Sequence, residues 1–420
     1  MKNYLKKLCL FVAAFFVFVT LFAGCSGTKT QTDSSGEVKK SDTQEQKEQV
    51  KEVVYKLGYF SNQYDSTYQK AIEGIEKAVP GVKMELVFYP TDKDYWDNLP
   101  AHIAAGTAPD LAAMTNEKHM DFISNGLILP IDESLVDLSA LYPKAVDAWK
   151  YEGKLYGIPL TAQPEAFIIN MDMWKEAGLT DLPETLEDVR EAARVLTKGD
   201  VKGLCINNHE FHLTQYALAF GGGWGYGETI DTPENARALQ FLIDMYREGL
   251  AVTPKEVGLG WDGEVFAKGL CAMTTGGTWY VATLAEMAPD MNYKMIPLPK
   301  GDTYGSTLHS IAIVVLKTAK DPEIASKIAA YLVRDEAQEV AMKDAGAPPS
   351  SVVMSESYFE NNPTVKDLKP VLDYAQPFAY PKEGQKFTEA LIKEFDEAIY
   401  TKDSTKSGAD IVKNVQALFK

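Results

Sequence analysis

The sequence predicts an α/β protein built from two lobes. Its 420 residues are too many for one hydrophobic core of ordinary size, and 45% of them are hydrophobic, as in a globular body. Segments with strand character alternate with segments of helical spacing along the body of the chain. Proline-containing joints near Ile158–Pro159, Ile296–Pro299 and Ala347–Pro349 interrupt this alternation. These three joints indicate that the chain crosses between the lobes three times.

The first 24 residues predict a signal peptide that is no part of the fold. Lys2, Lys6 and Lys7 precede the apolar run Leu8–Ala23, which is short for a membrane span. The run leads into LFAGC, which resembles a bacterial lipoprotein cleavage box ahead of Cys25. We therefore expect a lipid on Cys25 that anchors the protein to the cell membrane, facing the extracellular side. An ordinary secretory signal followed by a chance cysteine is the alternative.

Residues 25–50 predict a flexible tether between the lipid and the fold. After the cysteine this segment has no aromatic residue and only two apolar ones, so it cannot bury enough surface to offset chain entropy. The net charge of −17 leaves no basic footprint for nucleic acid, which we exclude as a partner. Cys205 and Cys271 lie in apolar runs, where buried free thiols are expected and a disulfide is the alternative.

The first part of the body predicts three strands that alternate with two helices. Strands are expected at 53–60, 83–90 and 110–115, and helices at 66–79 and 94–106. Pro80 and Gly81 stop the first helix, and Gly106 ends the second. This β-α-β-α-β order is typical of a sheet with helices on both faces.

The second part of the body repeats the alternation. Helices are expected at 186–197, 232–250 and 321–346, and strands at 203–207, 271–275 and 311–317. Thr232 and Asp321 are the expected N-caps of the later helices, the second with Pro322 in the first turn. Helices are expected to close the chain.

Motifs for metal, cofactor or catalytic chemistry are incomplete in this sequence. HEFH at His209–His212 places its histidines three residues apart, whereas a zinc-protease helix needs four. GGGWGYG at Gly221–Gly227 lacks the register and the lysine of a phosphate-binding loop. We therefore expect no cofactor, no metal site and no catalytic residue.

Several segments in a fixed order resemble one family of binding proteins. They are HIAAGTAPDLAAM, GLILPIDE, GKLYGIP with FIINMDMWKEAGL, FAKGLCAMTTGGTWYV, IPLPKGD and DPEIASKIAAYLVRDEAQ. In this order they resemble the extracellular solute-binding proteins of ABC importers (family 1), in the carbohydrate-binding class that includes maltose-binding proteins. The resemblance covers nearly the whole body, although Ile169-Asn170 stands where that family usually has Tyr-Asn.

This resemblance implies a periplasmic-binding-protein type II (Venus-flytrap) fold with a multi-strand hinge. It implies an N-lobe of residues 51–161 plus 298–346 and a C-lobe of residues 162–297 plus 347–420. A carbohydrate, expected to be an oligosaccharide, would bind in the cleft between the lobes and be delivered to the permease of an ABC importer. The protein would act as a monomer and perform no chemistry.

Trp279 is the first candidate for contact with the solute, because it matches the family's stacking tryptophan. Gly276 and Gly277 are expected to turn the chain from strand to helix, Thr278 to cap that helix, and Trp279 to lie in its first turn. Trp224 is a second candidate, on its glycine-rich loop. Packing of either indole in a core is the alternative.

Polar candidates follow other predicted strands, where ligands bind in open α/β sheets. Tyr59 and Asn62 lie in the loop after the first strand. Asn116 and Glu117 follow the Pro-Asp strand, and Gln163 lies at the first hinge crossing with Glu165 as its competitor. His209 follows the strand that holds Cys205, and His309 ranks below it. Each of these residues has an ordinary structural role as its alternative.

Three other functions are compatible with the sequence. The fold could carry a peptide, a polyamine or a phosphate ester in place of a sugar. A cell-surface carbohydrate-active enzyme would need two carboxylates in the cleft, one of them with a raised pKa. An adhesion or scaffold lipoprotein would not compact on binding a solute.

Overall fold

The computed structural model describes residues 52–419. The predicted signal peptide, Cys25 and the whole of the predicted tether therefore lie outside the described residues. Within the described part, no helix is both long and apolar enough to cross a membrane.

A first sheet is formed in the order β2-β1-β3-β14-β4, with β7 also paired to β14. Its strands are β1 (Val53–Tyr59), β2 (Val82–Phe88), β3 (Leu111–Thr115), β4 (Ile128–Leu129), β7 (Ile158–Pro159) and β14 (Ile311–Leu316). Strands β1, β2 and β3 run parallel, and β14 enters antiparallel beside β3. Every residue of β3 and β14 is buried, which is why both read as continuous apolar runs in the sequence.

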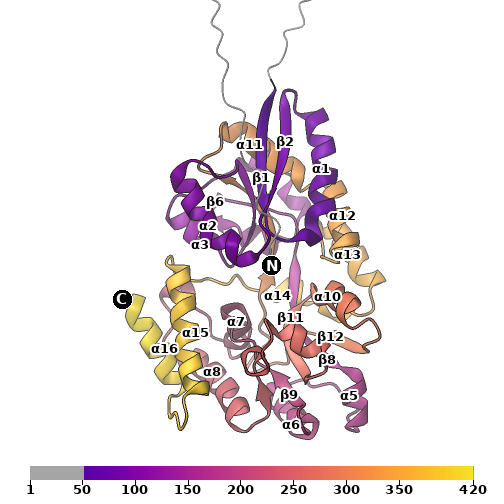
Figure 1. Cartoon of the computed structure of the whole chain (residues 1–420), viewed down its shortest axis with the longest axis vertical. Helices are drawn as coiled ribbons and strands as arrows, with labels where there is room; N and C mark the ends of the chain where they lie inside the picture. Colours follow the sequence, from indigo (N-terminus) through magenta and orange to yellow (C-terminus); the bar gives the residue numbers. More distant parts are fainter. Residues whose placement is uncertain (1–51, 420) are drawn as a thin grey trace, which may run out of the picture. The chain divides into compact units, whose positions relative to one another are not determined.

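Helices flank this sheet (Figure 1). They are α1 (Asp65–Ala78), α2 (Asp92–Ala105), α3 (His119–Ser124), α4 (Pro143–Asp147), α11 (Pro322–Leu332) and α12 (Asp335–Asp344). As expected, Asp321 caps α11, because its side chain accepts from the N–H groups of Glu323 and Ile324.

The prediction of a single helix over residues 321–346 is wrong. The backbone of Arg334 is extended, and the amide of Gln338 donates to the carbonyl of Val333 (2.8 Å), so the chain ends one helix there and starts another.

A second sheet is formed in the order β10-β9-β11-β8-β12, with β13 paired to β8. Its strands are β8 (Gln163–Asn170), β9 (Lys202–Cys205), β10 (Ala251–Val252), β11 (Cys271–Gly277), β12 (Tyr293–Ile296) and β13 (Leu308–His309). A separate hairpin joins β5 (Lys150–Tyr151) to β6 (Lys154–Leu155). Strand β8 is antiparallel to both β11 and β12, so its residues are buried along its full length.

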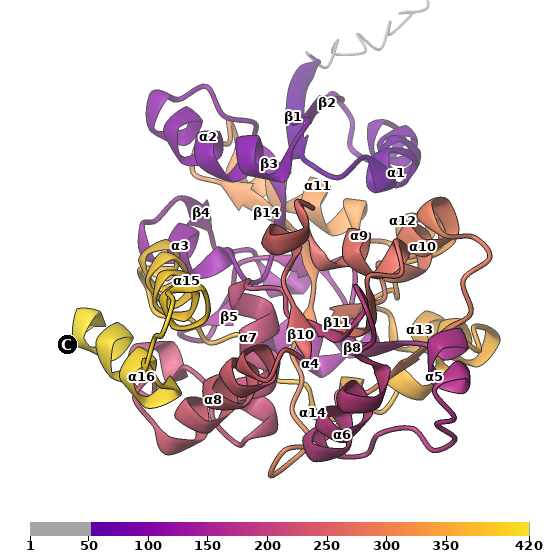
Figure 2. The same ribbon diagram turned by 60° about the horizontal axis from the view of Figure 1, so that its bottom comes forward.

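The other ten α-helices of the described part either cover this second sheet or close the chain. They are α5 (Met171–Glu176), α6 (Leu186–Leu196), α7 (Glu210–Ala219), α8 (Pro233–Arg247), α9 (Asp262–Ala267), α10 (Tyr280–Met287), α13 (Val352–Asn361), α14 (Val371–Tyr374), α15 (Gly384–Tyr400) and α16 (Gly408–Gln416). Thr232 caps α8 as expected, since its hydroxyl accepts from Asn235 N–H. Helices α15 and α16 pack beside α8, and α15 also reaches α3 (Figure 2).

Three segments run between the two sheets, and they are hydrogen-bonded to one another. The first follows β7, the second lies between β12 and β14, and the third follows α12. Ala162 N–H donates to Pro348 C=O (3.0 Å), Ser350 N–H to Leu160 C=O (3.2 Å) and the Ser310 hydroxyl to Thr161 C=O (2.8 Å). These crossings confirm the predicted two-lobed α/β fold with a multi-strand hinge. The predicted lobe boundaries fall in these segments and stay a prediction.

The two cysteines of the described part are both buried and free. Cys205 lies on β9 and Cys271 on the neighbouring β11. Each side chain packs in the apolar cluster that includes Phe266 and Tyr280. The expectation of buried free thiols is confirmed.

Candidate functional site

Strand β11 continues through both glycines that were expected to form a turn. Gly276 and Gly277 pair with Ala166 and Glu165 of β8, and neither has a positive φ. The predicted turn is therefore wrong, and the reason for glycine is space. A Cβ on Gly277 would lie 2.0 Å from the indole of Trp279, and one on Gly276 would lie 2.4 Å from the ring of Tyr280.

The indole of Trp279 lies directly over the end of this strand. Helix α10 begins at Tyr280, with Trp279 in the N-cap position, so the prediction that Thr278 caps the helix is wrong. The buried Thr278 hydroxyl instead donates to Gln163 Oε1 (3.4 Å). The Trp279 ring is partly exposed and lies 5.4 Å from His309 and 5.9 Å from Phe211, measured between ring centroids.

Glu117 meets His309 beside this indole. Glu117 follows β3 of the first sheet, and its Oε2 lies 3.3 Å from His309 Nε2 on β13. The Thr115 hydroxyl donates to the other carboxylate oxygen (2.7 Å). Burial would raise the pKa of Glu117, but the charge and hydrogen bond of His309, together with the charge of Lys118, lower it to about 2. Glu117 is therefore ionised at physiological pH.

A second ion pair, made by Lys118, links the segment after β3 of the first sheet to α7, which packs with the second sheet. Lys118 Nζ lies 3.0 Å from Glu210 Oε1, and His209 Nδ1 lies 2.9 Å from Glu210 Oε2. Burial would raise the pKa of Glu210, but the charges of His209 and Lys118 hold it well below its usual range. The predicted site residue His209 is thus paired with Glu210, which the sequence analysis did not identify.

Glu165 lies on β8 and is buried, with 1% of its surface exposed. Gln215 Nε2 on α7 donates to its Oε2 (2.9 Å). Burial raises the pKa of Glu165 well above its usual value, and the negative charges of Glu117 and Asp262 raise it further. The carboxyl is therefore held in its neutral form more readily than an ordinary glutamate.

Several buried polar atoms around Glu165 have no hydrogen-bond partner among the described residues. They include Glu165 Oε1, Gln215 Oε1, Thr307 Oγ1 and His309 Nδ1. An unpaired buried polar atom costs about 1–3 kcal/mol, so such atoms rarely gather without a purpose. We call Trp279, Glu117, His309, Glu165 and Gln215 the inner cluster. A ligand that supplies hydroxyl groups would satisfy its unpaired atoms.

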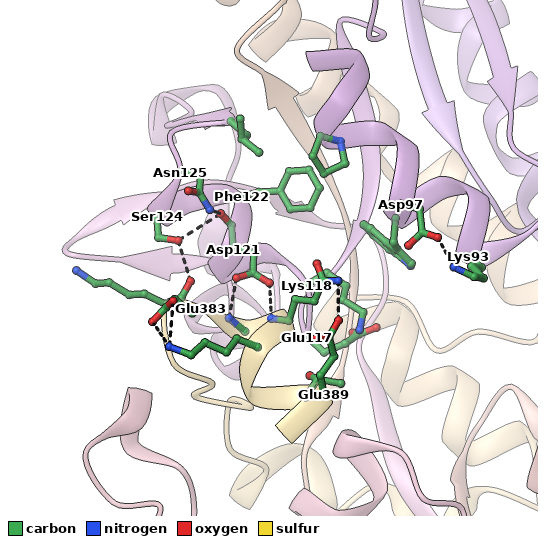
Figure 3. Close-up of a pocket in the computed structure, with 18 residues that line it drawn as sticks. Lys93, Asp97, Glu117, Lys118, Asp121, Phe122, Ser124, Asn125, Glu383 and Glu389 are labelled. Carbon is green, nitrogen blue, oxygen red and sulfur yellow. Dashed lines mark hydrogen bonds and ion pairs between the residues drawn. The ribbon is translucent and has the colours of Figure 1, made fainter. Parts of the chain in front are cut away.

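A groove of about 1190 Å³ opens next to the inner cluster and shares Glu117 with it. We call this cavity the outer groove; α2 and α3 form one wall and α15 the other (Figure 3). Trp96 on α2 is partly exposed; it packs against the first core and lines this groove. Its ring packs against Phe60 and Phe122 (centroids 5.4 and 6.2 Å apart). The size and mixed lining of the groove suit a small-molecule ligand.

The two walls of the outer groove are bonded to each other at one end. The Asp121 carboxylate accepts from the backbone N–H groups of Gly384 (2.6 Å) and Gln385 (2.8 Å) at the start of α15. Ser124 Oγ donates to the carbonyl of Lys382 (3.0 Å). Figure 3 shows Asp121 pointing from α3 toward these groups. The contact places negative charge at a helix N-terminus, where it is stabilising.

Several predicted residues do not reach the site. Trp224 has no exposed surface; its indole N–H donates to Thr214 Oγ1 (2.7 Å) and its ring packs on Phe387, so the glycine-rich loop turns it into the core. Tyr59 is 5% exposed and packs against Tyr68 in the first core.

Two polar candidates are also placed elsewhere or used structurally. Asn62 opens a short 3-10 turn on the surface. Asn116 is buried, and both ends of its amide bond the backbone: it donates to Leu308 C=O (2.8 Å) and accepts from Ser310 N–H (2.9 Å). It therefore ties β3 to the strand of His309. Among the described residues, no group of acidic, histidine or cysteine side chains is arranged to hold a metal ion.

The structure brings together the other predicted residues. Gly277 pairs with Glu165, Thr278 bonds Gln163, and Glu117 lies against the histidine that packs on Trp279. The sequence missed Gln215, Glu210 and Lys118. The only sequence signals were the HEFH segment, which holds Glu210, and the position of Lys118 directly after Glu117. Neither signal indicates a contact between the two sheets.

Comparisons with known proteins identify the relatives of this chain. The family described as bacterial extracellular solute-binding protein matches residues 70–367. The maltodextrin-binding protein MdxE of Bacillus subtilis (strain 168) is 25% identical over 425 residues, covering 97% of this chain and 96% of that protein. The arabinooligosaccharide-binding protein of the same strain is 24% identical over 353 residues, covering 78% of this chain and 76% of that protein.

A solved structure shares the fold. The ABC substrate-binding protein Lmo0181 from Listeria monocytogenes, solved in complex with cycloalternan, matches with a TM-score of 0.78 at 22% identity. The match covers 87% of this chain and 98% of that one. Because the family match spans more than half of the sequence and the fold agrees with it, this chain belongs to the bacterial extracellular solute-binding protein family.

Proposed function

We propose that this protein captures a carbohydrate, and specifically an oligosaccharide, and delivers it to an ABC importer. One observation carries the proposal: the partly exposed indole of Trp279 packs on His309 at the end of the strand that pairs with Glu165, and His309, Glu165 and Gln215 each keep a buried polar atom without a partner among the described residues. An aromatic face covers the C–H face of a sugar ring, and polar groups satisfy its hydroxyls. The relatives named for maltodextrin and arabinooligosaccharide binding support this solute class.

The proposed mechanism is closure of two lobes on the solute. Glu117 and Lys118 follow the first sheet, whereas Trp279 and Glu165 belong to the second. A ligand that touches both sets binds the closed form more tightly than the open form, and only such a difference in affinity can shift the equilibrium. The importer would then recognise the closed form. No bond of the solute is made or broken.

The proposal includes attachment to the membrane through a lipid on Cys25, with residues 25–50 as the tether. Family membership supports an extracellular place of action. An acyl anchor would keep a monomeric binding protein near its permease. Mass spectrometry of the membrane-extracted protein tests this part: a diacylglyceryl mass on an N-terminal Cys25 peptide supports it, and an unmodified peptide overturns it.

One observation favours the enzyme alternative. Glu117 is ionised while Glu165 has a raised pKa, and opposite protonation of two neighbouring carboxyl groups is the pattern of a glycosidase pair. Both groups already have partners, however: His309 holds Glu117 and Gln215 holds Glu165. Prolonged incubation of the purified protein with oligosaccharides decides between the two, because sustained turnover would exclude a function in binding alone.

A thermal-shift screen against monosaccharides and oligosaccharides tests the solute class. A ligand that binds only the folded protein stabilises it by about 2.7 kcal/mol when its concentration is a hundred times its Kd. We expect at least one oligosaccharide to raise the melting temperature, and Trp279→Ala to reduce that rise strongly at the same ligand concentration. If polyamines or peptides raise the melting temperature and no carbohydrate does, the fold carries a different solute.

A further inference from the structure

A second cavity lies beyond the outer groove, at the chain's C-terminal end. Its volume is about 930 Å³, and it shares Lys382, Glu383 and Lys386 with the outer groove. Its other walls come from the loop that holds Tyr226, from the β5 strand and from the residues after α16. The two cavities therefore share the start of α15 as a common wall.

Tyr226 presents an exposed ring to this second cavity from a strained backbone. Tyr226 is 47% exposed. Its backbone is left-handed (φ 54°, ψ 28°), a conformation that tyrosine rarely adopts. The Tyr226 N–H donates to the carbonyl of Ala379 (2.7 Å), and Ala379 also has a positive φ. Strain of this kind persists only where the surroundings impose it, and it gathers at functional sites.

The loop that holds Tyr226 is fixed from behind. Gln416 on α16 donates to the carbonyl of Gly227 (2.8 Å) and accepts from the N–H groups of Ile230 and Asp231. The backbone that carries the exposed ring is therefore held in place before any ligand arrives. A rigid aromatic residue on a supported loop loses little conformational freedom on binding.

The surroundings of the ring suit a sugar better than an apolar partner. Tyr151 lies across the cavity, and the Lys382 ammonium is 5.7 Å from the centre of its ring. Charged side chains of Glu228, Glu383 and Lys386 form the rim. Aromatic faces within a charged, hydrogen-bonding rim match the C–H faces and hydroxyls of a pyranose ring.

We propose that this second cavity, with Tyr226 as its platform, binds the distal residues of an oligosaccharide whose other end occupies the inner cluster. The inference rests on the proposed function and adds to it: the preferred solute is a chain long enough to pass along the outer groove. On this proposal, a sugar confined to the inner cluster does not contact Tyr226, and only a longer chain gains that contact.

Calorimetry with matched short and long sugars tests this inference. The probes are the trisaccharide and the heptasaccharide of the maltose series and of the α-1,5-arabinan series. We expect one heptasaccharide to bind wild type about five- to tenfold more tightly than its trisaccharide, from one added aromatic contact. Tyr226→Ala removes this gain and leaves the trisaccharide affinity unchanged, and Tyr226→Phe keeps the gain.

Two further variants separate binding from folding. Tyr226→Gly removes both the ring and the strain, so we expect an unchanged or higher melting temperature together with loss of the gain from chain length. Tyr304→Ala removes a similarly exposed tyrosine (54%) that does not line the cavity. This variant should change neither the melting temperature nor the gain in affinity with chain length.

The outcomes distinguish the two proposals. If no trisaccharide and no heptasaccharide binds wild type, the proposed function fails and this inference falls with it. If a trisaccharide binds but its heptasaccharide gains nothing, or if Tyr226→Ala keeps the full gain, the second cavity is not a sugar site and the proposed function stands.

Discussion

The inner cluster and the outer groove are adjacent but are built in opposite ways. Polar groups of the inner cluster are buried, and several lack a partner among the described residues. Charged groups along the outer groove are already paired, as Asp121 is with α15 and Lys93 is with Asp97. Unpaired buried groups gain most from a ligand, since water is excluded there, whereas paired groups at the surface gain little. We therefore expect the inner cluster to supply most of the affinity for the solute. The outer groove should change that affinity only slightly.

Replacement of Trp279 by alanine gives the strongest test of this difference. We expect the affinity for the best oligosaccharide of the panel to fall by about thirtyfold or more, because the indole is the main apolar surface of the inner cluster. The melting temperature without ligand should change little, since the ring is partly exposed. Calorimetry and thermal unfolding measure the two effects.

Trp174→Ala is the matched control for this prediction. Trp174 is 2% exposed and packs in the core of the second sheet. Its loss should lower the melting temperature strongly, with the affinity of the remaining folded protein unchanged. A collapse of stability in Trp279→Ala as well would show that Trp279 is a core residue.

Gly277→Ala tests whether the position of the indole matters as well as its presence. An added Cβ would overlap the Trp279 ring, so the ring must move. We expect roughly tenfold weaker binding and a loss of about 1–3 kcal/mol in stability from overpacking. Gly260→Ala is the control, because its Cβ would meet nothing closer than 3.7 Å. Equal sugar affinities of Gly277→Ala and Gly260→Ala would show that the position of the Trp279 indole does not matter for binding.

Glu165→Gln tests the protonation of the inner cluster through pH. The folded protein keeps the proton on Glu165 at pH values where the unfolded chain, with a pKa of 4.5, has lost it. The folded state then binds more protons, so the stability of wild type falls as pH rises above about 4.5. Glutamine removes this contribution and still accepts from Gln215.

We therefore expect the melting temperature of Glu165→Gln to match wild type near pH 4 and to exceed it by a growing margin toward pH 8. Thermal unfolding of both proteins across this range measures the margin. A constant difference at all pH values would mean that Glu165 titrates normally.

Asp121→Asn should have the smallest effect, because it acts in the outer groove. It weakens the charge-assisted bonds to Gly384 and Gln385 that join α3 to α15. We expect about a threefold loss of affinity and less compaction with ligand in small-angle scattering. In Asp132→Asn, the matched control, the carboxylate bonds only Ser134 in its own turn. An effect larger than that of Gly277→Ala would reverse the ranking of the two regions.

Local patterns in the sequence were enough to predict most of the fold. The buried strands β3 and β14 read as unbroken apolar runs, and Thr232 and Asp321 marked two helix starts. The break at Arg334 was missed because helical spacing continues through it. The reason for Gly277 was also missed, since a steric contact with a ring two residues later leaves no pattern in composition.

The candidate site was predicted only in part, for a physical reason. Trp279, Glu117 and Glu165 carry signals in their own segments. Gln215 and His309 become meaningful only when α7 and β13 are brought against β8, and no spacing along the chain encodes that meeting. Trp224 shows the converse: its exposed-looking glycine-rich loop folds inward because Thr214 and Phe387 offer a buried partner and an apolar face.

The position of β8 has a kinetic consequence. Strand β8 begins where the first crossing ends, and it pairs with β13 at the second crossing, so Glu165 lies close to the hinge. In the proposed closure, Glu165 would therefore move little, and we expect contacts to it to form when the solute first binds. Contacts from Glu117 and Lys118 would form only after the lobes close, so we expect them to govern how slowly the solute leaves. Substitutions on the second sheet should thus change the association rate constant, and those after β3 the residence time of the sugar.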